Sequence, residues 1–402
     1  MESPPTGSAG PVGTPAAAEH LRRQNTSLVL RSLRHQGAAT RTELARRTGL
    51  AKATVGVIVS ALDAAGAVVE DGPGPAAEAG QRGRGRPGRP VVLDGSKLLG
   101  LGLELNVGYV SAVVLDLAGR VRLHEHRSVA PDGRVDALLR LARDVVAALP
   151  GSRLVGAMVA VPGLVRGDDT TIAWTPNLGV EGADLAARVE SAIGHRCQVE
   201  VGNDANCAAY AEHRHGAAAD VRHAIYLTGT VGIGAGVIDD GRLLRGADGF
   251  AGEVGHMPLG DSTASCGCGR RGCWEASIGL PAMLAKVGLP ELDTPVSTAT
   301  AVADRAGEPR VAAGLDELGR EVGLGLAALT NLLNPEAVVL GGYFVALGEH
   351  VLAPARAALD ERLPSRVQRR PELRLSMLGL EAAATGAAEL ALEAVFSGDV
   401  VL

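Results

Sequence analysis

The sequence predicts an α/β protein in two parts, a small helical head near the N-terminus and a larger body of two lobes with a cleft between them. Residues 41–60 have the spacing of two helices packed around a glycine turn. From Val91 onward, strand-like runs alternate with runs of helical period, which is typical of an α/β architecture. Between these parts lies a stretch rich in Gly, Pro and Arg, residues 72–90, which we expect to be a linker or wing.

Periodicity predicts the order of elements in the body. Strands are expected at Leu99–Leu105, Tyr109–Leu117, Leu154–Val161, Gln198–Val201, His223–Leu227, Ala235–Ile238 and Ala337–Leu340. Helices are expected at Val135–Leu149, Leu185–Ile193 and Asn203–His213. The first two strands flank a polar turn and are expected to pair. From about Pro309 the chain should be mostly helical, with one strong strand.

Length and charge support the division into domains. A chain of 402 residues is too long for one core, and 46% hydrophobic residues with 21% charged residues exclude a disordered protein. The formal charge of -6 is unevenly distributed. Residues 20–90 carry twelve Lys or Arg and five Asp or Glu, a net +7, which leaves -11 for residues 91–402. A basic head on an acidic body indicates that only the head contacts nucleic-acid phosphates.

No segment predicts secretion or membrane insertion. Residues 1–19 lack a basic start and a long apolar core. The best membrane candidate, residues 98–117, is interrupted by three polar residues and is better explained as two strands. Three of the five cysteines fall within eight residues, which favours a metal site in a reducing compartment over disulfides. We therefore expect a cytoplasmic protein.

The head has the pattern of a helix-turn-helix. Residues 1–18, rich in Pro, Gly, Ser and Ala, are predicted to be a disordered tail, followed by the head at 19–92 and the body at 93–402. Ala45 is small where two helices approach, and Gly49 stands where the turn requires a positive φ. Four apolar residues face a shared core: Leu44, Leu50, Val55 and Ile58.

The start of the second helix predicts the DNA contacts. Lys52, Ala53 and Thr54 lie at its exposed N-terminal end, the part that enters the major groove, and Arg41 is a further candidate. Ala51 stands where a capping Ser is commoner, so this helix start is slightly weakened. The alternative is an ordinary three-helix bundle with no role in DNA binding.

A basic arm follows a predicted wing strand at Ala67–Glu70. In residues 81–90 the Gly-Arg-Pro unit occurs twice, and an extended Arg flanked by Gly and Pro is slim enough for a minor groove narrowed by A·T pairs. The candidates for this contact are Arg84, Arg86 and Arg89. The alternative, a solvated linker, is less favoured beside a helix-turn-helix.

The cysteine cluster predicts a structural zinc site. Cys266, Cys268 and Cys273 lie on a Gly-rich loop and can occupy three corners of a tetrahedron. His256, ten residues upstream, is the candidate for the fourth ligand. A site with three cysteines and one histidine is closed, with no open position for water. The alternative is a redox-active or free cysteine cluster.

Several motifs of the body resemble those of the ROK family, which groups bacterial sugar kinases with sugar-responsive repressors. They are Glu253-Val-Gly-His256, the cysteine loop followed by Trp274-Glu275, Glu200-Val-Gly-Asn203-Asp204-Ala-Asn206, Pro162-Gly163, Pro176-Asn177-Leu-Gly179 and Gly341-Gly342. The match covers about residues 20–395. It implies a winged helix-turn-helix followed by a two-lobed actin-like ATPase fold, with zinc at the cysteine loop and a sugar in the interlobe cleft.

The resemblance also implies which residues bind the sugar. Carried over by motif, they are Asn203, Asp204, Glu253, His256 and Glu275, with Asn177 as a weaker candidate. Carboxylates and amides suit this role because they form paired hydrogen bonds to neighbouring hydroxyls. His256 would bind zinc through one ring nitrogen and face the sugar with the other, which links the ligand to the metal loop.

The first hairpin favours a regulator over a kinase. The general base of a ROK kinase is present as Asp204, but the phosphate-binding turn Asp-x-Gly-Gly-Thr is replaced by Glu104-Leu-Asn106-Val107-Gly108. Both glycines of that turn are gone, and Val107 places a β-branched side chain where the backbone must approach phosphate. The second glycine-rich turn, residues 228–236, is retained. We therefore predict that the protein is not an enzyme and that Asp204 is a vestigial base.

The resulting hypothesis is a sugar-controlled regulator, most simply a repressor, of double-stranded operator DNA. We expect a homodimer or dimer of dimers whose paired heads bind a pseudo-palindromic operator and release it when a sugar closes the lobes. The alternatives are an ATP-dependent sugar kinase that uses Asp204 and a zinc-stabilised interaction protein without a ligand. Loops at 168–174 and 248–250 border the expected sugar but contain no residue that names it.

Overall fold

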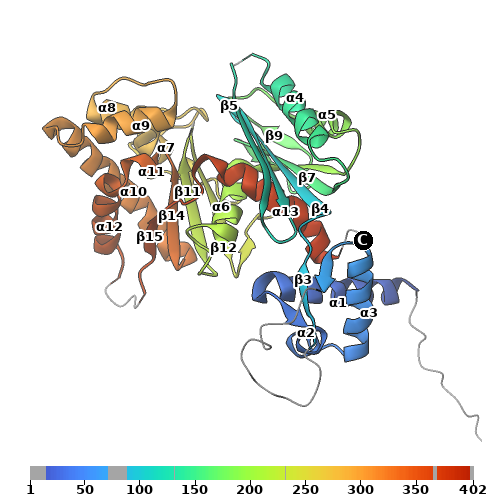
Figure 1. Cartoon of the computed structure of the whole chain (residues 1–402). Helices are drawn as coiled ribbons and strands as arrows, with labels where there is room; N and C mark the ends of the chain where they lie inside the picture. Colours follow the sequence, from blue (N-terminus) through green and yellow to red (C-terminus); the bar gives the residue numbers. More distant parts are fainter. Residues whose placement is uncertain (1–14, 71–87, 131, 231, 365–368, 399–402) are drawn as a thin grey trace, which may run out of the picture.

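The head is a helix-turn-helix with a small three-stranded sheet, and it lies at one end of a two-lobed body (Figure 1). The computed structural model describes residues 15–70, 88–130, 132–230, 232–364 and 369–398. The head contains α1 (Pro15–Gln36), β1 (Ala39–Thr40), α2 (Arg41–Thr48), α3 (Lys52–Ala64), β2 (Val68–Glu70) and β3 (Pro90–Leu93). Strand β3 pairs antiparallel with both β1 and β2, so the chain returns through the middle of this small wing sheet.

The turn between α2 and α3 has the predicted geometry, whereas the predicted tail was too long. Gly49 adopts a φ of 74°, the left-handed conformation that ends α2. Helix α1 begins at Pro15, so the prediction of disorder was wrong for residues 15–18. The reason is local, because alanine has the highest helix propensity and proline is favoured in a first helical turn. Residues 1–14 of the predicted tail lie outside the described residues.

The first lobe, lobe I, is a five-stranded sheet with helices on both faces. Its elements are β4 (Leu98–Leu105), β5 (Tyr109–Asp116), β6 (Val121–Ser128), α4 (Arg134–Ala147), β7 (Arg153–Val161), α5 (Asp184–Ala192) and β10 (Val199–Asn203), with a separate hairpin of β8 (Leu164–Val165) and β9 (Ile172–Trp174). The strand order is β10-β7-β4-β5-β6. Helices α4 and α5 pack on one face, and the last helix, α13 (Ala382–Ser397), packs on the other.

The second lobe, lobe II, holds the other five-stranded sheet, in the order β13-β12-β11-β14-β15. Its strands are β11 (Ala224–Gly229), β12 (Ile233–Asp239), β13 (Arg242–Leu243), β14 (Ala337–Gly342) and β15 (Glu372–Leu375). Its helices are α6 (Asp204–His215), α7 (Glu275–Ile278), α8 (Leu280–Val287), α9 (Pro295–Asp304), α10 (Pro309–Leu333), α11 (Phe344–Leu347) and α12 (Glu349–Arg362), with short 3₁₀ turns at Val254–His256 and Gly379–Glu381.

Helices α6 and α13 lie side by side between the two sheets (Figure 1). Their contact depends on small residues: a Cβ on Gly386 of α13 would stand 1.7 Å from the carbonyl oxygen of Cys207 in α6. A Cβ on Gly102 of β4 would likewise stand 1.9 Å from the carbonyl oxygen of Ala384. Because such close backbone packing leaves no room for sliding, α6 and α13 form one rigid unit with the centre of lobe I.

The strands and helices expected in the body are present, but five strands were missed: β6, β8, β9, β13 and β15. Strands β6, β13 and β15 each lie at the edge of a sheet, and β8 and β9 form a separate hairpin of two and three residues. Strand β6 has the sequence VRLHEHRS and is mostly exposed, so it lacks the apolar alternation that identifies a half-buried strand. Strand β15 has only four residues, two of them charged. A strand at a sheet edge need not alternate apolar and polar residues, and the prediction relied on that alternation. This explains why β6 and β15 were missed.

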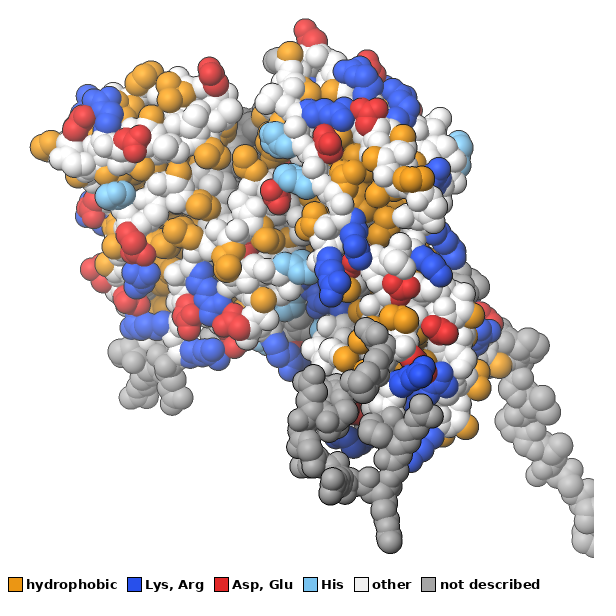
Figure 2. Space-filling view, in the orientation of Figure 1, with side chains coloured by type: hydrophobic (Ala, Val, Ile, Leu, Met, Phe, Trp, Pro, Cys, Tyr) orange, Lys and Arg blue, Asp and Glu red, His pale blue; other side chains and the backbone are white. Residues whose placement is uncertain are grey.

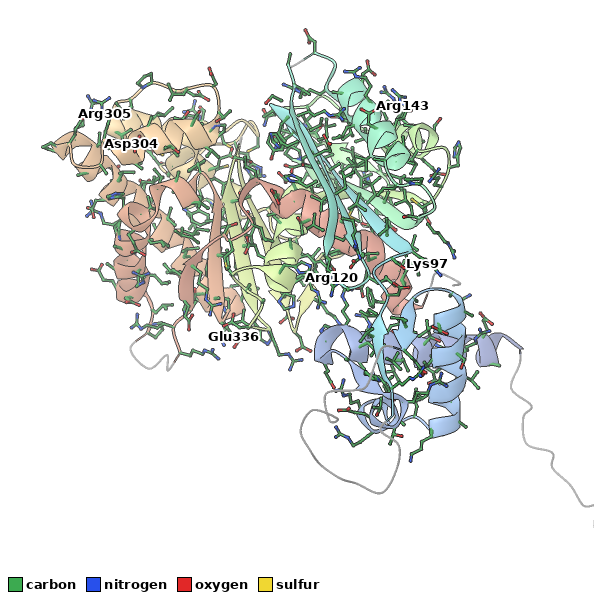
Figure 3. The ribbon with its side chains drawn as sticks, viewed as in Figure 1. Lys97, Arg120, Arg143, Asp304, Arg305 and Glu336 are labelled. Atoms are coloured by element: carbon green, nitrogen blue, oxygen red, sulfur yellow. The ribbon has the colours of Figure 1, made fainter. Side chains whose placement is uncertain are left out.

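The head shares a continuous apolar core with lobe I and α13. Val29, Leu30 and Leu33 of α1 belong to the same buried cluster as Val395 and Phe396 of α13. Lys97 and Arg120, labelled in Figure 3, lie on the body where it meets the head. The aliphatic chain of Lys97 covers Gly66, since a Cβ there would meet the Lys97 Cδ at 2.7 Å. The head is therefore packed against the body as well as tethered to it.

The surface of the body carries mixed charge. Figure 2 shows acidic and basic side chains interspersed over the visible face of both lobes, without one extended basic surface. This agrees with the prediction that the body does not bind nucleic acid through general electrostatic attraction. Among the described residues, no helix is both long enough and apolar enough to cross a lipid bilayer.

Candidate ligand cleft, metal centre and nucleic-acid interface

The start of α6 places a carboxylate between the two lobes. Asn203 caps this helix: its Oδ1 accepts a hydrogen bond from the backbone N–H of Asn206 at 2.9 Å, and its Nδ2 donates to the carbonyl oxygen of Gly163 at 3.0 Å. Both ends of the Asn203 amide are thus committed to protein contacts. As the cap of α6, Asn203 positions Asp204, and its predicted sugar contact remains a prediction.

Asp204 faces a second carboxylate, Glu104, which the sequence analysis did not select. Burial, and then the charge of Glu104, raise the pKa of Asp204 to about 7. Burial also raises the pKa of Glu104 to about 7, although its side chain accepts hydrogen bonds from Tyr109, Asn106 and Ser111. Asp204, Glu104 and Tyr109 line one small cavity with Thr228. A glutamate within the apolar run of β4 was the sequence signal for this pair.

The first hairpin fills its own phosphate-binding position with side chains. Asn106 Oδ1 accepts a hydrogen bond from the backbone N–H of Val107 at 2.8 Å, and Asn106 Nδ2 donates to Glu104 at 3.1 Å. The Tyr109 hydroxyl donates to the same carboxylate at 2.6 Å. The Val107 N–H is therefore already satisfied, and the carboxyl group of Glu104 lies beside it.

A second cavity, of about 380 Å³, opens beside the metal loop. It is lined by Leu164, Trp174, Phe250, Glu253, His256, Met257, Cys268 and Arg270. Glu253 is open to solvent in the cleft, yet the surrounding walls, and then the Glu275 carboxylate, raise its pKa. Glu275 is held in place because its Oε2 accepts a hydrogen bond from the backbone N–H of Ile233 at 2.9 Å.

The six residues predicted to bind sugar are therefore only partly brought together. Glu253 and His256 share a cavity, and Glu253 lies close enough to Asp204 and Glu275 for charges to interact. Asn177, in contrast, lies on an exposed loop outside that cavity, where its backbone carbonyl accepts a hydrogen bond from Arg134 at 3.3 Å. Its predicted sugar contact remains a prediction.

The four predicted metal ligands converge. One ligand atom from each of His256, Cys266, Cys268 and Cys273 lies within 4.8 Å of all the others. The Sγ atoms of Cys268 and Cys273 are 3.7 Å apart, and Cys266 Sγ is 3.8 Å from His256 Nδ1. Sulfur ligands about 2.3 Å from a tetrahedral zinc stand about 3.8 Å from one another, so the donor set and its spacing fit zinc.

The head presents the predicted recognition residues to solvent. Lys52 and Ala53 are exposed and Thr54 is half-buried at the start of α3. Ala51 provides no side-chain cap, as expected. The Arg41 guanidinium, however, donates to Glu70 of the wing at 2.5 Å and to Gly56 and Ser60 at 3.4 Å. Arg41 therefore holds the head together, and a contact with DNA would require it to leave Glu70.

The arm is described only at its end. Arg89 is exposed immediately before β3. Arg84 and Arg86 lie outside the described residues, so the predicted minor-groove contact stays a prediction. Because β3 is paired on both sides, Arg89 projects from a fixed base next to the wing.

Charged side chains join the head to α6 and α13, and sequence reasoning missed this junction. Arg34 of α1 forms an ion pair with Glu389 of α13; the two side chains are 7% and 1% exposed. Glu389 also lies 2.7 Å from His215 Nε2 at the end of α6. Glu393 of α13 pairs with Arg31 and Arg34. Only the fold reveals this cluster, since its members are far apart in the sequence.

The head, the cleft and the junction between them have the arrangement expected of a ligand-responsive transcriptional regulator. Comparison with known proteins identifies the family to which the chain belongs. A model of the ROK family matches residues 100–394. The xylose repressor of Bacillus subtilis is 31% identical over 380 residues, covering 93% of this chain and 96% of the relative. The chain belongs to the ROK family, in its repressor branch.

The extent of each match separates regulators from kinases. The solved structure of a ROK family transcriptional regulator, a homologue of the Escherichia coli Mlc protein, superposes with a TM-score of 0.79 at 25% identity and covers 94% of this chain and 98% of that one. The Streptomyces coelicolor glucokinase is 31% identical, but covers only 73% of this chain while using 98% of the enzyme. The kinase thus lacks a counterpart for about a quarter of the chain.

Proposed function

We propose that this ROK protein represses transcription by binding operator DNA with its head and releases the operator when a sugar binds between its lobes. The observation that carries the proposal is that a xylose repressor and a ROK transcriptional regulator match 93% and 94% of this chain, a span that must include most of the head as well as the body. A repressor acts where the chromosome is, which places the protein in the cytoplasm.

The proposed route from cleft to head runs along α6 and α13. Asp204 at the start of α6 faces the cleft, and His215 at the end of the same helix contacts Glu389 of α13. Glu389 in turn holds Arg34 of the head. Since α6 and α13 are packed too closely to slide past one another, a sugar that pulls on Asp204 would tilt both helices together and change how α13 holds the head.

We propose that the body has lost kinase activity. The turn that would bind phosphate is occupied by Asn106 and lies beside the carboxylate of Glu104. A β- or γ-phosphate placed there would meet negative charge and find the Val107 N–H already bonded. Asp204 remains in place, so it could still orient a sugar hydroxyl, although no phosphoryl donor would be bound beside that hydroxyl.

Zinc would be held by His256, Cys266, Cys268 and Cys273 and would supply structural cross-linking of the loop rather than reaction chemistry. The contact of Cys266 Sγ with His256 Nδ1 leaves Nε2 of the same ring as the nitrogen available to a sugar. The metal loop then supports one wall of the cleft.

The proposed oligomer is a homodimer or dimer of dimers, because paired heads would bind an operator with two half-sites. Lys52 would contact a phosphate beside the major groove, Ala53 and Thr54 would contact base edges, and Arg89 with the preceding arm would follow the backbone or an adjacent minor groove.

The test combines DNA binding and turnover. DNA fragments selected from a random library by the purified protein are labelled, and binding is followed by fluorescence anisotropy with a panel of hexoses, pentoses and N-acetyl sugars. We expect at least one sugar to weaken binding. In a parallel assay, ATP with the same sugars should give no ADP above the Asp204→Asn control. Robust sugar-dependent ADP release would contradict the regulator proposal, as would failure to select any DNA.

A further inference from the structure

A third cavity, of about 400 Å³, has walls from both edge strands β10 and β13. Lobe I contributes Met158 of β7 and Glu200 of β10, lobe II contributes Leu243 of β13, and Leu390 of α13 completes the wall. We call this space the edge-strand cavity. Among the described residues, it shares no lining side chain with the cavity beside the metal loop or with the small cavity beside Asp204. It is therefore separate from the proposed sugar site.

A bridge between the lobes stands between the edge-strand cavity and the cavity beside the metal loop. The ion pair of Arg245 with Asp169 joins the segment after β13 to the β8–β9 hairpin, and both side chains line the edge-strand cavity. Further along the same two segments, Trp174 and Phe250 line the cavity beside the metal loop. The two cavities thus lie on different sides of one ion pair.

One of the three carboxyl groups that line the edge-strand cavity has no partner. Asp169 is paired with Arg245, and Glu393 is paired with two arginines of α1. Glu200 is half-buried and forms no hydrogen bond or ion pair with any residue that the structure describes. Burial, and then the charge of Asp169, raise its pKa. A half-buried carboxylate without a partner costs free energy, which a bound cation would offset.

An amide in the same lining also has an unused acceptor. Asn206 of α6 is 7% exposed, and its buried Oδ1 has no hydrogen-bond partner within the described parts of the chain. Because buried polar atoms are nearly always paired, this oxygen requires an explanation. Met158, Leu243 and Leu390 supply apolar surface around these polar groups. A few unpaired polar groups in an otherwise apolar cavity of this size are typical of a small-molecule site.

We infer that the edge-strand cavity is a second ligand site and that its ligand is a small organic cation with an aliphatic body. The N–H donors of the cation would serve Glu200 and Asn206, and its body would pack on Met158 and Leu243. The inference goes beyond the proposed function, because binding here requires neither sugar nor DNA. The site also lies next to the junction with the head, since Glu393 is part of its lining.

Three probes of similar shape and different charge test the ligand class: cyclohexylammonium, cyclohexanol and cyclohexanecarboxylate. Binding to the full chain is followed by NMR of isotope-labelled methionine methyl groups, assigned with Met158→Leu and Met257→Leu. Met158 lines the edge-strand cavity, whereas Met257 lines the cavity beside the metal loop. We expect cyclohexylammonium to shift the Met158 signal but not the Met257 signal. It should bind about tenfold more tightly than cyclohexanol, and cyclohexanecarboxylate should not bind.

Two variants locate the site. Glu200→Gln keeps the shape of the side chain and removes its charge, so the preference for the ammonium over the alcohol should disappear. Leu243→Ala, on the other lobe, should weaken both probes and keep that preference. Asp316→Asn is the matched control, because it removes one exposed carboxylate of α10 that does not line the cavity. Its binding of all three probes should be unchanged.

Several results would overturn the inference. They are the absence of a Met158 shift with cyclohexylammonium, a Met257 shift in its place, a preference for the ammonium that survives in Glu200→Gln, and unchanged affinity in Leu243→Ala. None of these measurements uses sugar or operator DNA. The second site and the proposed function can therefore each fail without the other.

Discussion

The junction between head and body predicts that one carboxylate controls the response to sugar. Glu389 is 1% exposed and pairs with Arg34, which is 7% exposed. Burial lowers the pKa of Arg34 to about 10, so its guanidinium stays charged at neutral pH and must have an anionic partner. Its guanidinium carbon also lies 3.9 Å from the centroid of the Phe396 ring. The substitution Glu389→Gln preserves the volume of the side chain and removes only its charge.

We expect Glu389→Gln to destabilise the packing of the head against the body. Removing one partner of a buried ion pair costs about 3–5 kcal/mol because the other charge remains buried. Glu393, 29% exposed, still lies 3.3 Å from Arg34 and compensates in part. A cost near the lower end, about 3 kcal/mol, would raise the undocked fraction of heads about a hundredfold. The body keeps its own cores, so sugar binding should be unchanged.

The assay is operator binding with and without the effector sugar, measured by anisotropy, alongside calorimetry for the sugar and hydrogen exchange for α1. In Glu389→Gln, sugar should bind normally, exchange in α1 should rise, and the effect of sugar on operator affinity should shrink toward none. Asp316→Asn is the matched control, because Asp316 and Arg320 form an exposed pair on α10 worth at most about 1 kcal/mol. If sugar changes operator affinity in Glu389→Gln by the same factor as in the natural protein, the α6–α13 route is wrong.

Three further predictions concern the metal loop, the carboxylate pair and the head. Cys268→Ser should lose bound zinc by atomic absorption and lower the thermal midpoint, whereas stoichiometric zinc in this variant would contradict the ligand set. The pKa of Glu104 is raised from 4.5 to about 7, so the folded state holds the Glu104 proton more strongly than the unfolded state does. The free energy of unfolding should therefore fall as pH rises from about 4.5 to about 7, and Glu104→Gln should reduce that fall in urea titrations at pH 5 and 8. Lys52→Ala should weaken operator binding and reduce the salt slope by about one, and an unchanged slope would exclude a phosphate contact.

Local patterns were sufficient to predict the α/β fold class, the turn at Gly49 and a cluster of four side chains that could hold a metal. Each of these depends on residues close in sequence: Gly49 supplies a positive φ, and the cysteines lie on one short loop that His256 reaches from ten residues upstream. Periodicity failed at β6 and β15 because an edge strand has no fixed burial pattern. Composition failed at residues 15–18, where helix propensity of the alanines outweighed the low complexity of the segment.

Motifs select candidate site residues but not their geometry. Motifs gave Asp204 and Glu253, yet they could not show that the amide of Asn203 is used in capping α6 and in bonding Gly163. Nor could they pair Glu104 with Asp204, since only the fold brings the end of β4 and the start of α6 to one cavity. A residue in a binding motif can contact the ligand or position its neighbour, and only the hydrogen-bond partners distinguish the two.

The first hairpin of the body, between β4 and β5, explains how a body with a kinase-like fold can serve as a sensor. In a phosphoryl-transfer enzyme the first turn must leave its backbone N–H groups free for phosphate. Here Asn106 satisfies the Val107 N–H and, with Tyr109, binds Glu104; burial, and then the charge of Glu104, raise the pKa of Asp204 at the neighbouring helix start. The side chains that occupy this turn also build a polar cluster beside α6. Since α6 leads to Glu389 and Arg34, this cluster lies at the origin of the proposed route to the DNA-binding head.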